Sequence, residues 1–268
     1  MSFQQKYPIT PRYLDAGTKR RSGIPIAPSV KFVVAHDTGN PNSTASGNVS
    51  YYKTSQNEVY ASAHIFVDDK EIIECIPALT GPLPEKAWHV LYDLTKDNEL
   101  FGHNANDAAI GIEYCFGANI NADAAYQRYL WVIAYVCFVY NLDPRTSIVG
   151  HFVLDPARRT DPRTGLGQSG RTYEQLLTDI VTEYQNSLSP PAPMPMPAPI
   201  PAPSPIPSPP PVSPLPLPPI FFPPPVPPIP PAPFPPQPPP PAPTLGKAGI
   251  FAGFLGLFRG ISNWWRKL

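Results

Sequence analysis

Apolar and polar positions along the first 188 residues follow two different periods. Short runs rich in β-branched residues predict strands, and the second and third of these form a hairpin across Asp68-Asp-Lys. Longer segments with apolar residues three and four apart predict helices. Strands interleaved with helices predict an α/β domain in which helices flank a mixed central β-sheet. The predicted strands occupy residues 31–36, 61–67, 71–76, 88–90 and 109–115, and the predicted helices occupy 42–54, 126–142 and 172–185.

Proline ends this pattern abruptly. Of the 43 prolines, 32 lie between Pro190 and Pro243. Such a density removes amide donors and fixes φ, which excludes helix interiors and central strands. We therefore expect a folded domain over residues 1–188, followed over 189–244 by a disordered, extended polyproline linker.

The last segment, residues 245–268, has the pattern of a cationic amphipathic helix. Its large apolar residues share one arc of a helical wheel, whereas its basic residues and several glycines occupy the other. Such helices suit the surface of an anionic membrane. Docking onto the folded domain, or self-association through the glycine face, is the competing interpretation. The large apolar residues are Phe251, Phe254, Leu255, Phe258, Ile261, Trp265 and Leu268.

The net charge of zero hides an asymmetry between the two parts of the chain. Residues 190–268 carry +4 and the remainder −4, so the folded part lacks the basic surplus that nucleic-acid binding requires. Cys75, Cys115 and Cys137 lie in apolar runs without CxxC spacing, which favours buried thiols over a disulfide framework. The N-terminus has no apolar signal-peptide region, so synthesis in the cytoplasm is expected.

Four polar residues are candidates for a catalytic metal site. His36 ends the first predicted strand, and His151 and Asp161 lie ten residues apart in a turn-rich segment. Two imidazoles and a carboxylate form a ligand set that catalytic zinc sites use. Glu113, among apolar residues of the 109–115 strand, is a carboxylate that should be paired or functional. These residues are the components of a zinc hydrolase.

The same residues lie in motifs that resemble a known family. His36-Asp-Thr-Gly-Asn, Ala61-Ser-Ala-His64, Ala87-Trp-His89, Ile110-Gly-Ile-Glu113 and His151…Arg158-Arg-Thr-Asp-Pro162 occur in the order seen in type-2 zinc-dependent N-acetylmuramoyl-L-alanine amidases. This class includes phage endolysins, Bacillus cell-wall amidases and peptidoglycan-recognition domains. The resemblance covers about residues 20–187. It implies one Zn²⁺ and cleavage of the amide that joins N-acetylmuramic acid to L-alanine.

The resemblance also implies roles for individual residues. His36, His151 and Asp161 match the metal ligands, with Asp161 where many relatives have cysteine, and Glu113 matches the catalytic carboxylate. Arg159 stands where relatives often place an oxyanion-stabilising lysine, and arginine changes the geometry at that point. Trp88 and His89 match a substrate groove. His64 either lines this groove or packs in the core, and Arg158 pairs with Asp155 or Asp161 as scaffold.

Two functions remain open at this point. The first is a peptidoglycan hydrolase of the endolysin or autolysin type, which acts at the cell wall after release from the cytoplasm. The alternative is a non-catalytic peptidoglycan-binding module that delivers a membrane-active C-terminal helix. The complete metal set favours the enzyme.

Overall fold

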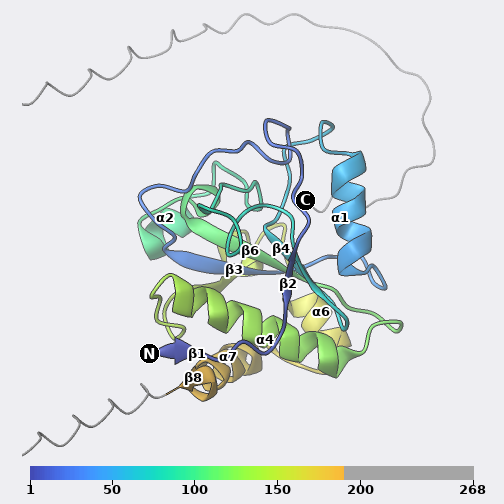
Figure 1. Ribbon diagram of the computed structural model, residues 1–268, viewed down its shortest axis with the longest axis vertical. Coiled ribbons are helices and arrows are strands. Elements are labelled where there is room, and N and C mark those ends of the chain that lie inside the picture. Colours follow the sequence, from blue (N-terminus) through green and yellow to red (C-terminus); the bar gives the residue numbers. More distant parts are fainter. Residues whose placement is uncertain (190–268) are drawn as a thin grey trace, which may run out of the picture. The chain divides into compact units, whose positions relative to one another are not determined.

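A six-stranded sheet forms the centre of the protein in the computed structural model, which describes residues 1–189 (Figure 1). Its strand order is β2-β5-β4-β6-β3-β7, and all neighbours are parallel except the antiparallel hairpin β4-β5. The predicted mixed sheet is therefore confirmed. The strands are β2 (Ile9–Pro11), β3 (Phe32–Asp37), β4 (Ile65–Val67), β5 (Ile72–Glu74), β6 (Ala109–Tyr114) and β7 (Ile148–Gly150).

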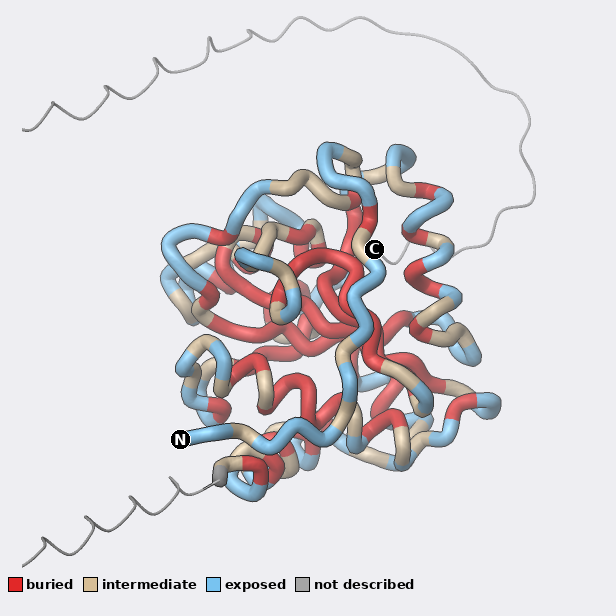
Figure 2. The backbone as a smooth tube through the Cα atoms, viewed as in Figure 1, coloured by how far each residue is buried: buried red, intermediate tan, exposed pale blue. Residues whose placement is uncertain are grey.

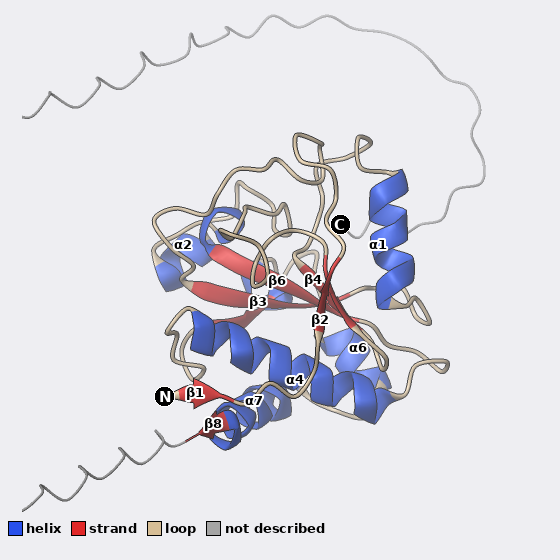
Figure 3. Cartoon of the chain, viewed as in Figure 1, coloured by secondary structure: helices blue, strands red, loops and turns tan. Residues whose placement is uncertain are grey.

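Helices cover both faces of this sheet (Figure 3). Helix α4 packs against α7 and against β3, β4 and β6, while α1 packs against β4 and β5. Four of the helices begin at side-chain caps: Thr44 for α1, Asn104 for α3, Asn121 for α4 and Thr172 for α7. The helices are α1 (Ala45–Thr54), α2 (Lys96–Phe101), α3 (Ala105–Ala108), α4 (Ala122–Val139), α5 (His151–Leu154), α6 (Arg163–Gln168) and α7 (Tyr173–Ser187).

Alternate residues of the central strands enter different hydrophobic clusters. In β3, Val33 and Ala35 join the cluster built around α4, whereas Phe32 and Val34 join a cluster on the opposite face. All six residues of β3 are buried, as are all six of β6, so the middle of the sheet has no solvated face (Figure 2). Because successive side chains of a strand point to opposite faces, the position of a polar residue in its strand decides on which face of the sheet it lies.

The first and last described residues form a small second sheet. Strand β1 (Ser2–Phe3) pairs antiparallel with β8 (Leu188–Ser189). The Phe3 ring lies 5.1 Å from the ring of Phe138 in α4 and 6.0 Å from that of Tyr184 in α7. The N-terminal arm thus fastens the end of α7 to α4.

One predicted strand is wrong. Residues 88–90 form no strand, because a side chain takes the place of a neighbouring strand. Asn106 accepts hydrogen bonds through Oδ1 from the backbone N–H groups of His89 and Val90, and donates through Nδ2 to the carbonyl of Val90. These backbone groups therefore have no need of a sheet partner.

The three cysteines are free and buried, as the sequence predicts. No helix within residues 1–189 has both the length and the apolar character needed to cross a bilayer. Apart from Ser189, the expected linker over 189–244 and the expected helix over 245–268 lie outside the described residues.

Candidate active site

The candidate catalytic residues converge where three parallel strands end. His36 lies near the end of β3, Glu113 near the end of β6, and His151 directly follows β7. In the register of the sheet, His36 is paired with Glu113. His36 lies on the same face of β3 as Phe32 and Val34, and Glu113 lies on the same face of β6 as Ala109, so both side chains face away from α4. Ligand sites in open α/β sheets commonly lie at the carboxyl ends of strands.

His36, His151 and Asp161 form a cluster that could hold a metal ion. The Nδ1 atoms of His36 and His151 lie 2.9 Å and 3.1 Å from the same oxygen, Oδ2 of Asp161. The candidate donor atoms of the three residues all lie within 4.8 Å of one another. The structure therefore brings together three residues that are up to 125 positions apart in the sequence.

Burial and hydrogen bonding keep this cluster in a form suited to a cation. Burial lowers the pKa of His36 to about 4, so its imidazole is neutral at pH 7. Burial would raise the pKa of the Asp161 carboxyl, but hydrogen bonds from His151 and His36 outweigh it and hold the pKa well below its usual range. A neutral imidazole and an ionised carboxylate are ligands that divalent metals bind.

The loop between α5 and α6 places Asp161 beside the histidines. The backbone N–H of Phe152 donates to the carbonyl of Asp161 at 3.0 Å, which joins the two ends of the loop. Within the loop, Arg158 Nε donates to Asp155 Oδ2 at 2.8 Å, so Arg158 has the scaffold role with Asp155 rather than with Asp161.

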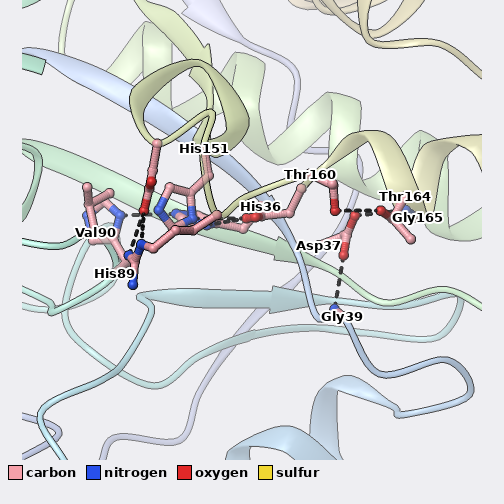
Figure 4. A network of polar contacts seen from close by, with 12 residues as sticks. His36, Asp37, Gly39, His89, Val90, His151, Thr160, Thr164 and Gly165 are labelled. Atoms are coloured by element: carbon pink, nitrogen blue, oxygen red, sulfur yellow. Dashed lines mark hydrogen bonds and ion pairs between the residues drawn. The ribbon is translucent and has the colours of Figure 1, made fainter. Parts of the chain in front are cut away.

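Asp37 connects this loop to the first strand. Its Oδ2 accepts a hydrogen bond from the N–H of Gly165 in α6, and its Oδ1 accepts one from the N–H of Gly39 (Figure 4). The sequence analysis missed this residue. The Asp-Thr-Gly turn after His36 was the available signal, because aspartate commonly bonds the backbone two residues ahead in such turns.

Glu113 has an unused carboxylate oxygen inside the site. Its Oε2 is buried and has no hydrogen-bond partner among the described residues, and the residue is only 8% exposed. Burial raises the pKa of this carboxyl well above 4.5, and the charges of Asp161 and Asp37 raise it further. An unpaired carboxylate with a raised pKa is typical of general acid–base groups.

Four histidine rings form a row of successive contacts, in which His36 contacts both His89 and His151. Adjacent ring centroids in the order His151, His36, His89, His64 lie 4.7, 5.2 and 5.6 Å apart. His89 Nδ1 lies 3.1 Å from Nε2 of His36. The sequence offered His89 only as a groove residue and missed its contact with His36.

His64, at the end of the row, is a packed residue. Its Nδ1 accepts a hydrogen bond from the N–H of Gly111 at 3.0 Å, and its Nε2 donates to the carbonyl of Glu85 at 2.8 Å. It is fully buried and does not line the pocket that holds the other site residues. Of the two interpretations open from the sequence, these contacts favour the packed histidine.

One hollow of about 100 Å³ includes most of the candidate residues. Trp88, His89 and Arg159 line it together with Glu113 and the three residues of the metal cluster. Arg159 Nε is buried without a hydrogen-bond partner among residues 1–189, and burial lowers the pKa of its guanidinium, opposed by the charge of Asp161.

Tyr129 of α4 supports the site from the other face of the sheet. Its hydroxyl donates to the carbonyl of His36 at 2.9 Å and lies 3.3 Å from that of Ile112, so it joins β3 to β6 beneath the site. The sequence pattern gave no signal for this role, because Tyr129 stands among the apolar residues of a helix that is buried nearly all round.

Comparison with known proteins agrees with this geometry. The family model for N-acetylmuramoyl-L-alanine amidase, Amidase_2, matches residues 27–164. The N-acetylmuramoyl-L-alanine amidase BlyA of Bacillus subtilis (strain 168) is 33% identical over 154 residues, which make up 54% of this chain and 40% of BlyA. The chain therefore aligns with less than half the length of that relative.

Solved structures show the same fold. The catalytic domain of XlyA superposes with a TM-score of 0.51 at 23% identity, over 65% of this chain and 99% of that domain. The Staphylococcus aureus hydrolase AmiA, solved in complex with its ligand, superposes with a TM-score of 0.53 at 22% identity, over 67% of this chain and 85% of AmiA. The resemblance drawn from the sequence motifs is confirmed, and the chain belongs to the N-acetylmuramoyl-L-alanine amidase family.

Proposed function

We propose that this protein hydrolyses peptidoglycan at the amide bond between N-acetylmuramic acid and L-alanine, at the cell wall, with zinc as its cofactor. One observation carries the proposal: an unpaired buried carboxylate, Glu113, lies in the same hollow as the three-residue metal cluster. We assign this activity to the folded domain, residues 1–188. Membership of the amidase family supports the reaction and the substrate class.

The donor set fits zinc. His36, His151 and Asp161 would hold the ion through two imidazole nitrogens and one carboxylate oxygen, a three-ligand set that leaves a position for the reaction. A bound zinc ion supplies Lewis-acid polarisation of the carbonyl and makes water a better nucleophile at neutral pH. His151 Nε2 is buried without a partner among the described residues, whereas His36 Nε2 contacts His89, so of the two rings only that of His36 has a hydrogen-bond partner at Nε2.

His89 is proposed as the residue that positions His36. When Nδ1 of His36 faces a cation, its Nε2 carries the ring proton and donates it to Nδ1 of His89 across 3.1 Å. The backbone of His89 is itself held by Asn106 Oδ1 at 2.9 Å. His89 also lines the hollow, so its role in the substrate groove remains part of the proposal.

Glu113 is proposed as the general base and acid. Its free Oε2 accepts a proton from the attacking water and then returns that proton to the leaving L-alanine nitrogen. The raised pKa suits both steps, because the group must hold the proton between them. Arg159 would stabilise the negative charge that develops on the carbonyl oxygen, since its guanidinium lines the hollow with Nε unpaired. Trp88 would pack on the substrate.

Digestion of purified Bacillus peptidoglycan tests the proposal. Wild type, Glu113→Gln and the surface control Glu58→Gln are compared, with new L-alanine amino termini and new reducing sugars assayed separately. We expect alanine termini without reducing sugars from wild type and the control, and at least about a hundredfold less from Glu113→Gln. A chelator should abolish the activity and zinc should restore it. Intact wall binding without cleavage would overturn the proposal in favour of a recognition module.

A further inference from the structure

A second hollow adjoins the candidate active site. It has a volume of about 460 Å³ and lies along the loop between α5 and α6 and the start of α6. Three of its residues, Arg159, Thr160 and Thr164, also line the catalytic hollow, so the two hollows are neighbours. The lining residues are Phe152, Pro156, Arg159, Thr160, Arg163 and Thr164.

The lining of this second hollow is positively charged. Its lining includes Arg159 and Arg163, together with two threonines, and no acidic residue. The Arg163 guanidinium lies 3.6 Å from the centroid of the Phe152 ring, a stacking contact that restricts its orientation. Stacked arginine is suited to planar, bidentate recognition of a carboxylate.

These two arginines differ from others in the described part of the chain. Arg21 pairs with Glu85, Arg145 with Asp143 and Arg171 with Asp123. Neither the Arg159 nor the Arg163 side chain makes an ion pair or a side-chain hydrogen bond within residues 1–189; the charge of Glu174 is felt near Arg163 only at longer range. A hollow lined by two arginines that have no ion-paired carboxylate is a favourable place for an anion.

We infer that this hollow binds the free α-carboxylate of the second stem-peptide residue, a γ-linked D-glutamate. The inference rests on the proposed function, because that function places the scissile amide beside Glu113. The first stem residue is L-alanine, so the carboxylate of the next residue lies about 6 Å beyond the scissile nitrogen. A carboxylate at this distance from the scissile nitrogen would lie in the second hollow, which shares Arg159 with the catalytic hollow.

Uncharged residues line part of the catalytic hollow. Trp88, Ser62 and Phe66 line this hollow but not the second one. The Trp88 ring lies 6.5 Å from that of Tyr92, which is largely exposed. Such a surface suits the uncharged N-acetylmuramic acid ring, whereas the arginine hollow suits the peptide. Amidation of the D-glutamate to D-isoglutamine should then weaken substrate binding.

Two soluble muramyl tripeptides test the inference with the full chain loaded with zinc. They differ only in whether the second stem residue carries a free α-carboxylate or a carboxamide. We expect wild type to prefer the carboxylate by about tenfold in kcat/KM, mostly through KM, as expected for one charge-assisted hydrogen-bonded contact. In Arg163→Gln this preference should fall to near one. In the matched control Arg145→Gln, an exposed arginine outside both hollows, the preference should remain.

A third tripeptide, amidated at a carboxylate of the third residue instead, distinguishes the position of the anion. It should be cleaved with the same kcat/KM as the free-carboxylate substrate. Cleavage of both second-residue forms at equal rates by wild type would overturn the inference while leaving the proposed amidase activity intact. A preference that survives in Arg163→Gln, or that follows the third residue, would also overturn it. Failure to cleave any substrate would instead contradict the proposed function.

Discussion

Replacing Gly111 by alanine should disturb the candidate metal centre without removing any polar group. Gly111 lies in β6, and a methyl group added to it would come within 2.7 Å of His89 Cγ and 2.8 Å of His89 Nδ1. Ordinary van der Waals contact begins at 3.4 Å, so the ring and the new methyl group must separate by about 0.7 Å. His89 is only 7% exposed, and its ring has little room to move.

The magnitude follows from this overlap. The hydrogen bond between His36 Nε2 and His89 Nδ1 is 3.1 Å long, so a displacement of about 0.4 Å takes it beyond hydrogen-bonding distance. Overpacking of this kind costs about 1–3 kcal/mol of unfolding free energy. For a domain of this size that lowers Tm by roughly 3–10 °C. Loss of an outer-shell hydrogen bond to a metal ligand should weaken zinc binding by about 10- to 100-fold.

Thermal unfolding of the metal-free protein and zinc competition against a chromophoric chelator measure the two effects. A His89→Ala background provides the control, because it removes the two atoms nearest the new methyl group, Cγ and Nδ1, and leaves the His89 Cβ at 3.2 Å. In that background Gly111→Ala should cost little further stability or zinc affinity, so the two substitutions should be strongly non-additive. If Gly111→Ala costs as much in both backgrounds, the steric reasoning is wrong. If zinc affinity is unchanged in every variant, His89 does not support the metal site.

Two further predictions concern buried titratable groups. Burial lowers the pKa of His64 to about 4, so this residue stabilises the fold above pH 6.5 and loses that contribution as pH falls toward 4. Between pH 7 and pH 5, urea unfolding should therefore show wild type losing about 2 kcal/mol more than His64→Gln, and equal losses would contradict the argument. The pKa of Glu113 is raised by burial, so this residue destabilises the metal-free fold as pH rises above 4.5. Glu113→Gln should thus gain Tm relative to wild type at pH 8 more than at pH 5; a gain that does not depend on pH would point to packing instead.

The sequence pattern predicted the central strands and helices correctly because the residues of each element share one kind of environment. The runs that became β3 and β6 are fully buried, and the helices α4 and α7 were predicted to within a few residues of their bounds. By contrast, β1, β2 and β8 have only two or three residues each, too few to show a period. Their pairing depends on chain segments that meet only after folding.

The sequence predicted which residues form the candidate site, but not which of them contact one another. The motifs named His36, His151, Asp161 and Glu113, and the structure brings all four into one hollow. What the sequence lacked was information on partners far apart in the chain. The contact between His36 and His89 spans 53 residues, and neither side carries a local signal for it. The hollow around Arg163 likewise exists only once the loop between α5 and α6 has folded.

The pairing of β1 with β8 connects the start of the chain to the last residues that the structure describes. Register pairs Ser2 with Ser189, and the carbonyl of Ser187 accepts a hydrogen bond from the N–H of Gln4. A force applied to the chain at residue 189 would therefore load the first four residues in shear before it reached the catalytic sheet. The pairing of β1 with β8 would therefore bear this force before the rest of the domain. An N-terminal truncation that looks harmless on the sequence would remove this pairing.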